Sequence, residues 1–290
     1  MTPQVLVNGI LLGGIYAAVG AGFSLVWGVL NIINIAHGAS VMLGAYVTFF
    51  LFSRFGLDPF LTIPISMLTL FVVGYVMQRA LINRVIAHGV FMTLVLTFGL
   101  SLFLIDMALL AFSADYRSVT PAYAGSGLSF GGLVVPYQRL AILAIALTLI
   151  AVLNVFLSTT RMGRAIRATV LNRQAAQLCG VDIHQIYAVT FGLGAALAGA
   201  AGSMLAMVVT ISPFMGNTFI GKSFVIATLG GLGTVQGALV GGLLLGLAES
   251  LGAAVLGPSY QQALGFALLL LVLVLRPEGL LGKKFFAEVK

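Results

Sequence analysis

Long stretches without a charged side chain are the feature that most limits what this chain can fold into. Residues 1–53, 183–221, 223–248 and 250–275 contain no Asp, Glu, Lys or Arg. Each stretch is longer than the roughly 20 residues that a helix needs to cross the hydrocarbon core of a bilayer. Charged residues make up only 7% of the chain, which excludes a soluble globular domain. We therefore expect an all-α polytopic membrane protein with a single membrane domain over residues 1–290.

Apolar runs between polar breaks predict where the individual spans lie. These runs cover residues 5–27, 32–52, 60–78, 90–112, 140–157, 186–211 and 261–275. A glycine-rich region at 224–256 is too long for one upright helix at about 1.5 Å per residue, and the sequence Gly-Gly-Leu-Gly at 230–233 interrupts it. We predict a broken pair here, one short arm and one full span. The total is then about eight or nine transmembrane helices, broken or re-entrant segments included.

Two interruptions are candidates for the translocation pathway, because non-helical backbone at membrane depth needs protein or a water-filled cavity around it. The first contains two amides and an imidazole without any Lys or Arg, and the second is the glycine-rich break. A buried structural role for the histidine is an equally good interpretation. The two sites share a faint pattern of small residues, and interrupted helices at corresponding places of a repeat often mark transporter binding sites. The candidate pathway residues are Asn31, Asn34, His37, Gly38, Gly233 and Gln236.

Positive charge predicts the orientation, because Lys and Arg concentrate in cytoplasmic loops. One predicted inside loop carries Arg79, Arg84 and His88, and a second covers about 158–185. A charge-poor segment at about 113–138 is the predicted outside loop. The N-terminus is then outside and the C-terminal tail cytoplasmic, so an odd number of crossings must follow residue 211. The inside tail contains Arg276, Lys283, Lys284 and Lys290.

Sequence strings typical of enzymes do not have the context that their chemistry needs. Residues 216–223 match the phosphate-binding loop pattern, but no strand precedes them, so Lys222 is interpreted as an interfacial anchor. The string at 127–131 matches a nucleophile elbow by chance. The three histidines are far apart, which predicts no metal site, no catalytic residues and no cofactor. The positive charge is split among loops, which argues against nucleic acid as a partner.

Two acidic residues lie in or near apolar runs, where charge is costly and often marks a pathway or a partner. Glu249 is near the end of its span, so interfacial placement and function are equally good interpretations. Asp106 could pair with another chain or cap the outer end of its span.

The basic segment at 158–185 has the pattern of a docking surface. Apolar residues recur every four positions from Met162, while arginines recur every three, which places an apolar stripe beside a basic one on a short helix. Such a helix would lie along the inner membrane face or insert into a groove on a partner.

The sequence Gln174-Ala-Ala-Gln-Leu-Cys-Gly180 resembles the Glu-Ala-Ala-x-x-x-Gly loop by which permeases of ATP-binding-cassette importers dock on their ATPases, with Gln174 in place of Glu. Residues 31–39, 161–168, 230–238 and 276–282 strengthen the match, and together they resemble the membrane permease subunit of branched-chain amino acid importers of the high-affinity leucine/isoleucine/valine type. The resemblance implies the following docking residues: Arg161, Gly163, Arg164, Arg167, Gln174, Ala175, Ala176 and Gly180.

The resemblance also implies the partners and the place of the chain. It implies a heterodimer with a second permease, two cytoplasmic ATPases that carry out ATP hydrolysis, a solute-binding protein outside, and a location in the bacterial inner membrane. The chain itself is then not an enzyme. Three alternatives remain open: a permease for urea or short-chain amides, an ion-coupled secondary transporter, and an energy-independent channel.

Overall fold

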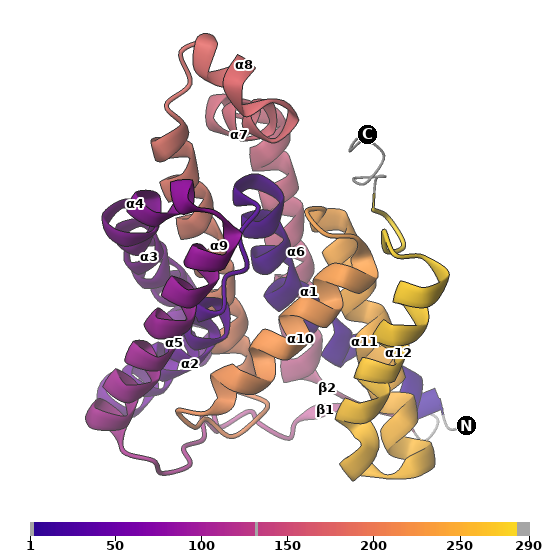
Figure 1. Ribbon diagram of the computed structural model, residues 1–290. Coiled ribbons are helices and arrows are strands. Elements are labelled where there is room, and N and C mark those ends of the chain that lie inside the picture. Colours follow the sequence, from indigo (N-terminus) through magenta and orange to yellow (C-terminus); the bar gives the residue numbers. More distant parts are fainter. Residues whose placement is uncertain (1–2, 131–132, 283–290) are drawn as a thin grey trace.

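The computed structural model describes residues 3–130 and 133–282 and shows a bundle of long helices (Figure 1). Eight helices in this part of the chain are long and apolar enough to cross a membrane, which confirms the polytopic architecture. They include α1 (Pro3–Leu30), α2 (Ala36–Phe55), α3 (Pro59–Met77), α5 (Val90–Phe112), α6 (Tyr137–Thr159), α9 (Ile183–Ala206), α11 (Val235–Leu256) and α12 (Gln261–Leu275).

Helices α1 and α9 form the centre of the bundle, and both are almost entirely buried along their most apolar stretch. Helix α11 packs along α1, while α2 and α3 pack along α9. These contacts depend on small residues, because small side chains let two backbones approach closely. A Cβ atom on Gly246 of α11 would lie 2.5 Å from the Cα of Gly13 in α1. A Cβ atom on Gly202 of α9 would lie 2.0 Å from the carbonyl oxygen of Val41 in α2.

The glycine-rich region forms the broken pair that the sequence predicts. Helix α10 (Met215–Gly230) is the short arm and α11 is the full span, joined by a turn at residues 231–234. The short arm begins at Met215 rather than at residue 224, so the string that matches a phosphate-binding loop is helical. Helices α10, α11 and α12 lie between α9 and the C-terminal segment, and α10, with 16 residues, is not among the eight helices that are long and apolar enough to cross a membrane.

The other predicted break is also present, at residues 31–35 between α1 and α2. The two breaks are followed by matching helix starts. His37 is the second residue of α2, and Gln236 is the second residue of α11. The breaks also lie against each other, since a Cβ atom on Gly28, just before the first break, would be 2.7 Å from the Cα of Gly233 in the second.

Two connecting segments differ from the sequence-based expectation. The predicted inside loop with Arg79, Arg84 and His88 is helical, because α3 continues through η1 (Gln78–Ile82), α4 (Asn83–Val85) and η2 (Ile86–His88). Arg79 anchors this extension by donating a 2.7 Å hydrogen bond to Oε1 of Gln185 in α9.

The predicted outside loop contains a small antiparallel hairpin, β1 (Gly127–Phe130) and β2 (Leu133–Pro136), which the all-α expectation does not include. The Tyr123 hydroxyl donates to Asp58 at 3.2 Å, which ties this loop to the start of α3. Burial, together with the adjacent Asp58 carboxylate, raises the pKa of Tyr123. In Figure 1 the hairpin lies at the opposite end of the bundle from the short helices α7 (Arg161–Leu171) and α8 (Arg173–Leu178).

The segment after α12 closes the second break. The backbone N–H groups of Leu280 and Leu281 donate to the carbonyl oxygens of Leu229 and Gly230 at 2.9 and 3.0 Å. These carbonyls belong to the last turn of α10, which has no helical partners for them. Arg276 of the predicted inside tail lies in this segment. Lys283, Lys284 and Lys290 fall outside the described residues.

Candidate functional site

The basic segment folds into two short helices, α7 (Arg161–Leu171) and α8 (Arg173–Leu178), called the α7–α8 pair below. Both helices begin at a residue whose side chain caps the helix. The Thr160 hydroxyl accepts a hydrogen bond from the Gly163 N–H, and the Asn172 side chain accepts one from the Ala175 N–H, each at 2.9 Å. Caps of this kind stabilise a helix by about 1 kcal/mol, so the pair has a defined shape.

Most of the predicted docking residues are on the surface of the α7–α8 pair. Gly163 and Ala176 are buried and therefore have a packing role instead. A Cβ atom on Gly163 would lie 2.4 Å from the carbonyl oxygen of Phe156, so this glycine permits the tight turn between α6 and α7. The exposed members of the predicted set are Arg161, Arg164, Arg167, Gln174, Ala175 and Gly180.

Two of the arginines hold α7 against the preceding span. Arg164 donates to the Thr159 carbonyl at 2.9 Å, and Arg167 donates to the Ser158 carbonyl at 3.0 Å. These carbonyls are at the C-terminal end of α6, where positive charge is favourable. A movement of α7 would therefore be passed directly to α6.

Sequence reasoning missed the most exposed apolar residues of this region. The exposed fractions of Leu171 and Leu178 are 87% and 90%. Leu171 ends α7 and Leu178 ends α8, and large apolar side chains beside polar ones often mark a surface that contacts another protein. The predicted apolar stripe is divided, since Ile166 is buried against the bundle while Val170 is exposed.

A cavity of about 580 Å³ lies between α7 and the second break. Arg167 and Leu171 line it from α7, Gly28 from α1, and Gly233 and Gln236 from the break and the start of α11. The predicted docking residue Arg167 therefore lines the same cavity as the predicted pathway residues Gly233 and Gln236.

The first break reaches the α7–α8 pair through a smaller cavity of about 240 Å³. Asn31 lines this cavity together with Thr169 of α7 and Arg173 of α8. The Arg173 guanidinium lies 5.3 Å from the ring centroid of Tyr187, which fixes α8 against α9. Both breaks therefore open toward the same helix pair.

The remaining pathway candidates lie deeper in the bundle. His37 is 1% exposed and its Nε2 is 3.0 Å from the Val19 carbonyl oxygen. Among the described residues, His37 Nδ1 and Asn34 Oδ1 are buried without a hydrogen-bond partner. Gly38 packs against Gly216 at the start of α10, where a Cβ atom would lie 2.2 Å from the Gly216 carbonyl oxygen.

A side chain that sequence reasoning did not single out supports the first break. The Thr97 hydroxyl of α5 donates to the Ile33 carbonyl at 3.0 Å and accepts from the Ile35 N–H at 3.3 Å. Thr97 therefore replaces the helical partners that two backbone groups in the break have lost. This contact satisfies the requirement for polar partners around non-helical backbone inside a membrane protein.

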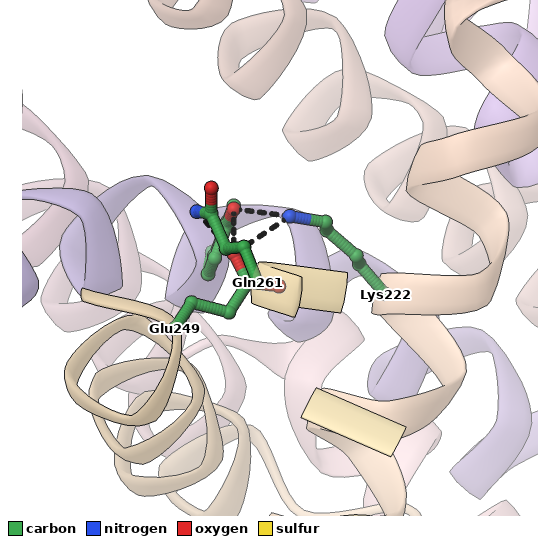
Figure 2. Close-up of polar contacts among 4 residues, drawn as sticks. Lys222, Glu249 and Gln261 are labelled. Atoms are coloured by element: carbon green, nitrogen blue, oxygen red, sulfur yellow. Dashed lines mark hydrogen bonds and ion pairs between the residues drawn. The ribbon is translucent and has the colours of Figure 1, made fainter. Parts of the chain in front are cut away.

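A buried cluster of polar residues joins four helices (Figure 2). Lys222 of α10 and Glu249 of α11 form an ion pair of 2.8 Å, with side chains 13% and 1% exposed. Tyr16 of α1 and Gln261 of α12 donate to the same carboxylate oxygen at 2.7 and 3.0 Å. Lys222 also donates to the Tyr16 hydroxyl.

This cluster corrects one interpretation of the sequence. Lys222 is not an interfacial anchor, because it lies in the middle of α10 and points into the bundle toward Glu249 (Figure 2). The Glu249 side chain is likewise buried, with hydrogen-bond partners on three neighbouring helices. Removing either partner would leave an uncompensated buried charge, which typically costs about 3–5 kcal/mol. Within the described residues, no group of three or more His, Cys, Asp or Glu is arranged to hold a metal ion.

Comparisons with known proteins agree over almost the whole chain. A family model described as branched-chain amino acid transport system / permease component matches residues 5–273. The high-affinity branched-chain amino acid transport system permease protein BraD of Pseudomonas aeruginosa is 34% identical over 296 residues, covering 97% of this chain and 95% of BraD. LivH of Escherichia coli, with the same description, is 32% identical over 294 residues, covering 97% and 95%. A probable branched-chain amino acid transport permease protein LivH of Methanocaldococcus jannaschii is 26% identical, covering 96% and 92%. No solved structure matches the chain.

Proposed function

Because the chain belongs to the family of permease components of branched-chain amino acid transport systems, we propose that it carries branched-chain amino acids across the bacterial inner membrane in an ATP-driven importer. The ATP is hydrolysed by two separate cytoplasmic subunits that dock on the α7–α8 pair. A second permease and an external solute-binding protein complete the importer. The substrate class is that of the relatives BraD and LivH.

The observation that carries this proposal is the position of the α7–α8 pair over both helix breaks. Its two caps and the bonds of Arg164 and Arg167 to α6 make it a stiff unit. A force applied to its exposed face would reach α6 through these bonds, and Gly28 and Gly233 line the same cavity as α7. A docked ATPase can shift the permease only if its contacts differ between the two states of the permease. We propose that the α7–α8 pair moves together with the two breaks. The contacts between the ATPase and the pair then differ between the two states of the permease.

The exposed leucines provide the sharpest test of docking. We expect Leu171→Asp and Leu178→Asp to lower recovery of the ATPase subunits in a detergent pull-down by about tenfold or more, since central apolar anchors dominate interface energies. The matched control is Leu128→Asp, which changes a 52% exposed leucine on the hairpin at the opposite end of the bundle. Equal recovery for Leu178→Asp and Leu128→Asp would contradict docking at this surface.

Orientation can be tested with the single cysteine. Cys179 is exposed just after α8, and the proposal places it in the cytoplasm, with the N-terminus outside and the C-terminus inside. A membrane-impermeant thiol reagent should label it in inside-out vesicles and not in intact spheroplasts. Labelling in intact spheroplasts would invert the topology and leave the ATPases without a docking surface.

A carboxylate on the outer face of α5 supports the second permease as a partner. Asp106 is exposed between large apolar side chains, including Phe103 at 58% and Leu110 at 79%. A charge that faces lipid is costly, so a partner that covers it is favoured. In the intact complex, Asp106→Cys should form crosslinks to the second permease, whereas Val155→Cys, exposed on α6, is the control. Exclusive modification of Asp106→Cys by lipid-phase reagents would contradict this interface.

Transport measurements distinguish the proposed importer from an ion-coupled transporter and from a channel. Vesicles that contain the whole complex should accumulate leucine only with ATP, and an uncoupler should not abolish uptake. An ion-coupled transporter would lose uptake with the uncoupler, and a channel would equilibrate leucine without ATP.

A further inference from the structure

We propose that the cavity beside the Lys222–Glu249 pair is a transient binding site for a zwitterionic α-amino acid with an apolar side chain. This inference rests on the proposed function and adds a site within the permease itself. The substrate carboxylate would bind Lys222, its ammonium group would bind Glu249, and its side chain would lie on the apolar wall of the cavity.

The cavity has the size and lining that such a ligand needs. It measures about 260 Å³ and lies between α10, α11 and α12, with Lys222 and Glu249 in its wall. This volume is just below the range of about 300–1,000 Å³ typical of small-molecule pockets, so it suits a single amino acid. The polar lining consists of Asn217, Thr218 and Gln262, and the apolar lining of Val225, Leu245 and Phe266.

Glycines keep the space beside the carboxylate open. A Cβ atom on Gly265 would lie 3.5 Å from Oε1 of Glu249. The hydrogen bonds to Glu249 from Tyr16, Gln261 and Lys222 all reach the other oxygen, Oε2. Oε1 is therefore the carboxylate atom beside the small residue, where an ammonium group can approach.

The charge balance favours a zwitterion over any singly charged ligand. A buried charge without a partner is expensive, so the Lys222–Glu249 pair can separate only if each member gains a new partner. A zwitterion supplies one negative and one positive group at once, and the number of ion pairs rises from one to two. If a carboxylic acid or an amine separated the pair, one of the two protein charges would be left without a partner. If an uncharged amide separated the pair, both protein charges would be left without a partner.

The same competition keeps the binding weak, which a transport pathway requires. Ions and substrates must bind well enough to enter a pathway and weakly enough to leave it. Here the protein's own ion pair re-forms when the ligand departs. Because Lys222 is on α10 and Glu249 on α11, the ligand would also loosen the contact between the two arms that meet at residues 231–234.

Thiol protection in the purified full complex tests this site directly. The background is Cys179→Ser with Thr218→Cys, and the rate of alkylation by a maleimide is measured. We expect saturating L-leucine to slow alkylation about tenfold, while isocaproate or isoamylamine at the same concentration slows it less than about twofold. Lys222→Met and Glu249→Gln should remove the protection by leucine. Asp115→Asn, which breaks the exposed Asp115–Arg117 pair, is the matched control and should retain it.

A second variant covers the case in which loss of a buried charge prevents folding. Gly221→Met leaves the ion pair intact and fills the cavity, since a Cβ atom there would meet only the tip of Phe266, at 3.5 Å. We expect it to lower ATP-driven leucine uptake about tenfold, with the complex still assembled. Equal protection by leucine and isocaproate, or unchanged uptake by Gly221→Met, would overturn the site. ATP-driven uptake by the unaltered complex would then leave the proposed function standing, whereas its absence would refute that function itself.

Discussion

The two helix breaks face the same helix pair but are stabilised in different ways. The break at 31–35 obtains its polar partners from a side chain, the Thr97 hydroxyl. At the break at 231–234 the Thr234 hydroxyl bonds to the Gly231 carbonyl oxygen at 2.8 Å, and the main chain adds the N–H groups of Leu280 and Leu281, which bond to the carbonyl oxygens of Leu229 and Gly230 just before the break. The first therefore depends on which functional group is present, and the second also depends on space for a second backbone. This difference predicts which substitutions each break tolerates.

The largest effect is expected where the second break meets the C-terminal segment. Gly231 has a φ of 104°, and a Cβ atom on it would lie 2.3 Å from the Gly282 backbone nitrogen. Gly231→Ala should reduce stability by ~3 kcal/mol, from backbone strain and overpacking together. Thermal unfolding in detergent micelles measures this loss.

The matched control is Gly257→Ala, which has a φ of 97° and no atom within 4 Å of the added Cβ. In this variant the backbone is strained but the added Cβ is not crowded, so it should cost less than Gly231→Ala, about 1–3 kcal/mol. Equal losses for both variants would show that the tail contributes nothing to the second break.

The next effect tests the side-chain support of the first break. Thr97→Val keeps the shape of the side chain and removes the hydroxyl that bonds to Ile33 and Ile35. Two partly buried backbone groups then lose a partner, so we expect a loss of about 1–3 kcal/mol in the same thermal measurement. Thr148→Val is the control, because the Thr148 hydroxyl is exposed and bonds only to its own helix at Ala144. A loss no larger than that of the control would show that the hydroxyl does not support the break.

The smallest effect concerns the backbone at the start of the first break. Asn31 has a φ of 52°, a left-handed conformation that asparagine tolerates better than most residues. Asn31→Gly should change stability by less than about 0.5 kcal/mol, whereas Asn31→Val should cost about 1–2 kcal/mol. Differential scanning fluorimetry of the two variants provides the comparison. Equal stability would show that the left-handed turn is not required, and the contrast between the breaks would then rest on Thr97 alone.

The spans could be predicted from the sequence because they depend on composition alone. An uncharged run longer than a bilayer's hydrocarbon core is itself the physical cause of a membrane helix. The pair of helices α10 and α11 could also be predicted from segment length, since the region at 224–256 is longer than one upright span. Its start at Met215 was not predicted, because the polar residues 216–218 resemble an interfacial turn.

The buried cluster could not be placed from local patterns, because its members come from four helices, and α1 is far in sequence from the other three. A signal was nevertheless present. Of the four lysines, only Lys222 precedes residue 283, and Glu249 is likewise isolated between two long uncharged stretches. Two opposite charges on neighbouring apolar segments have a strong physical reason to pair. Thr97 gave no such signal, since threonine hydroxyls in helices commonly bond to their own backbone.

The bonds from Leu280 and Leu281 to the end of α10 also set an order for assembly. Residues 276–282 leave the ribosome after every membrane helix described here, so α10 and α11 enter the bilayer before their junction has its final hydrogen-bond partners. A polypeptide that stops at residue 275 would hold all its spans and still display bare carbonyls at that junction. The hydrogen bonding of this junction is therefore completed only when the segment after α12 has docked.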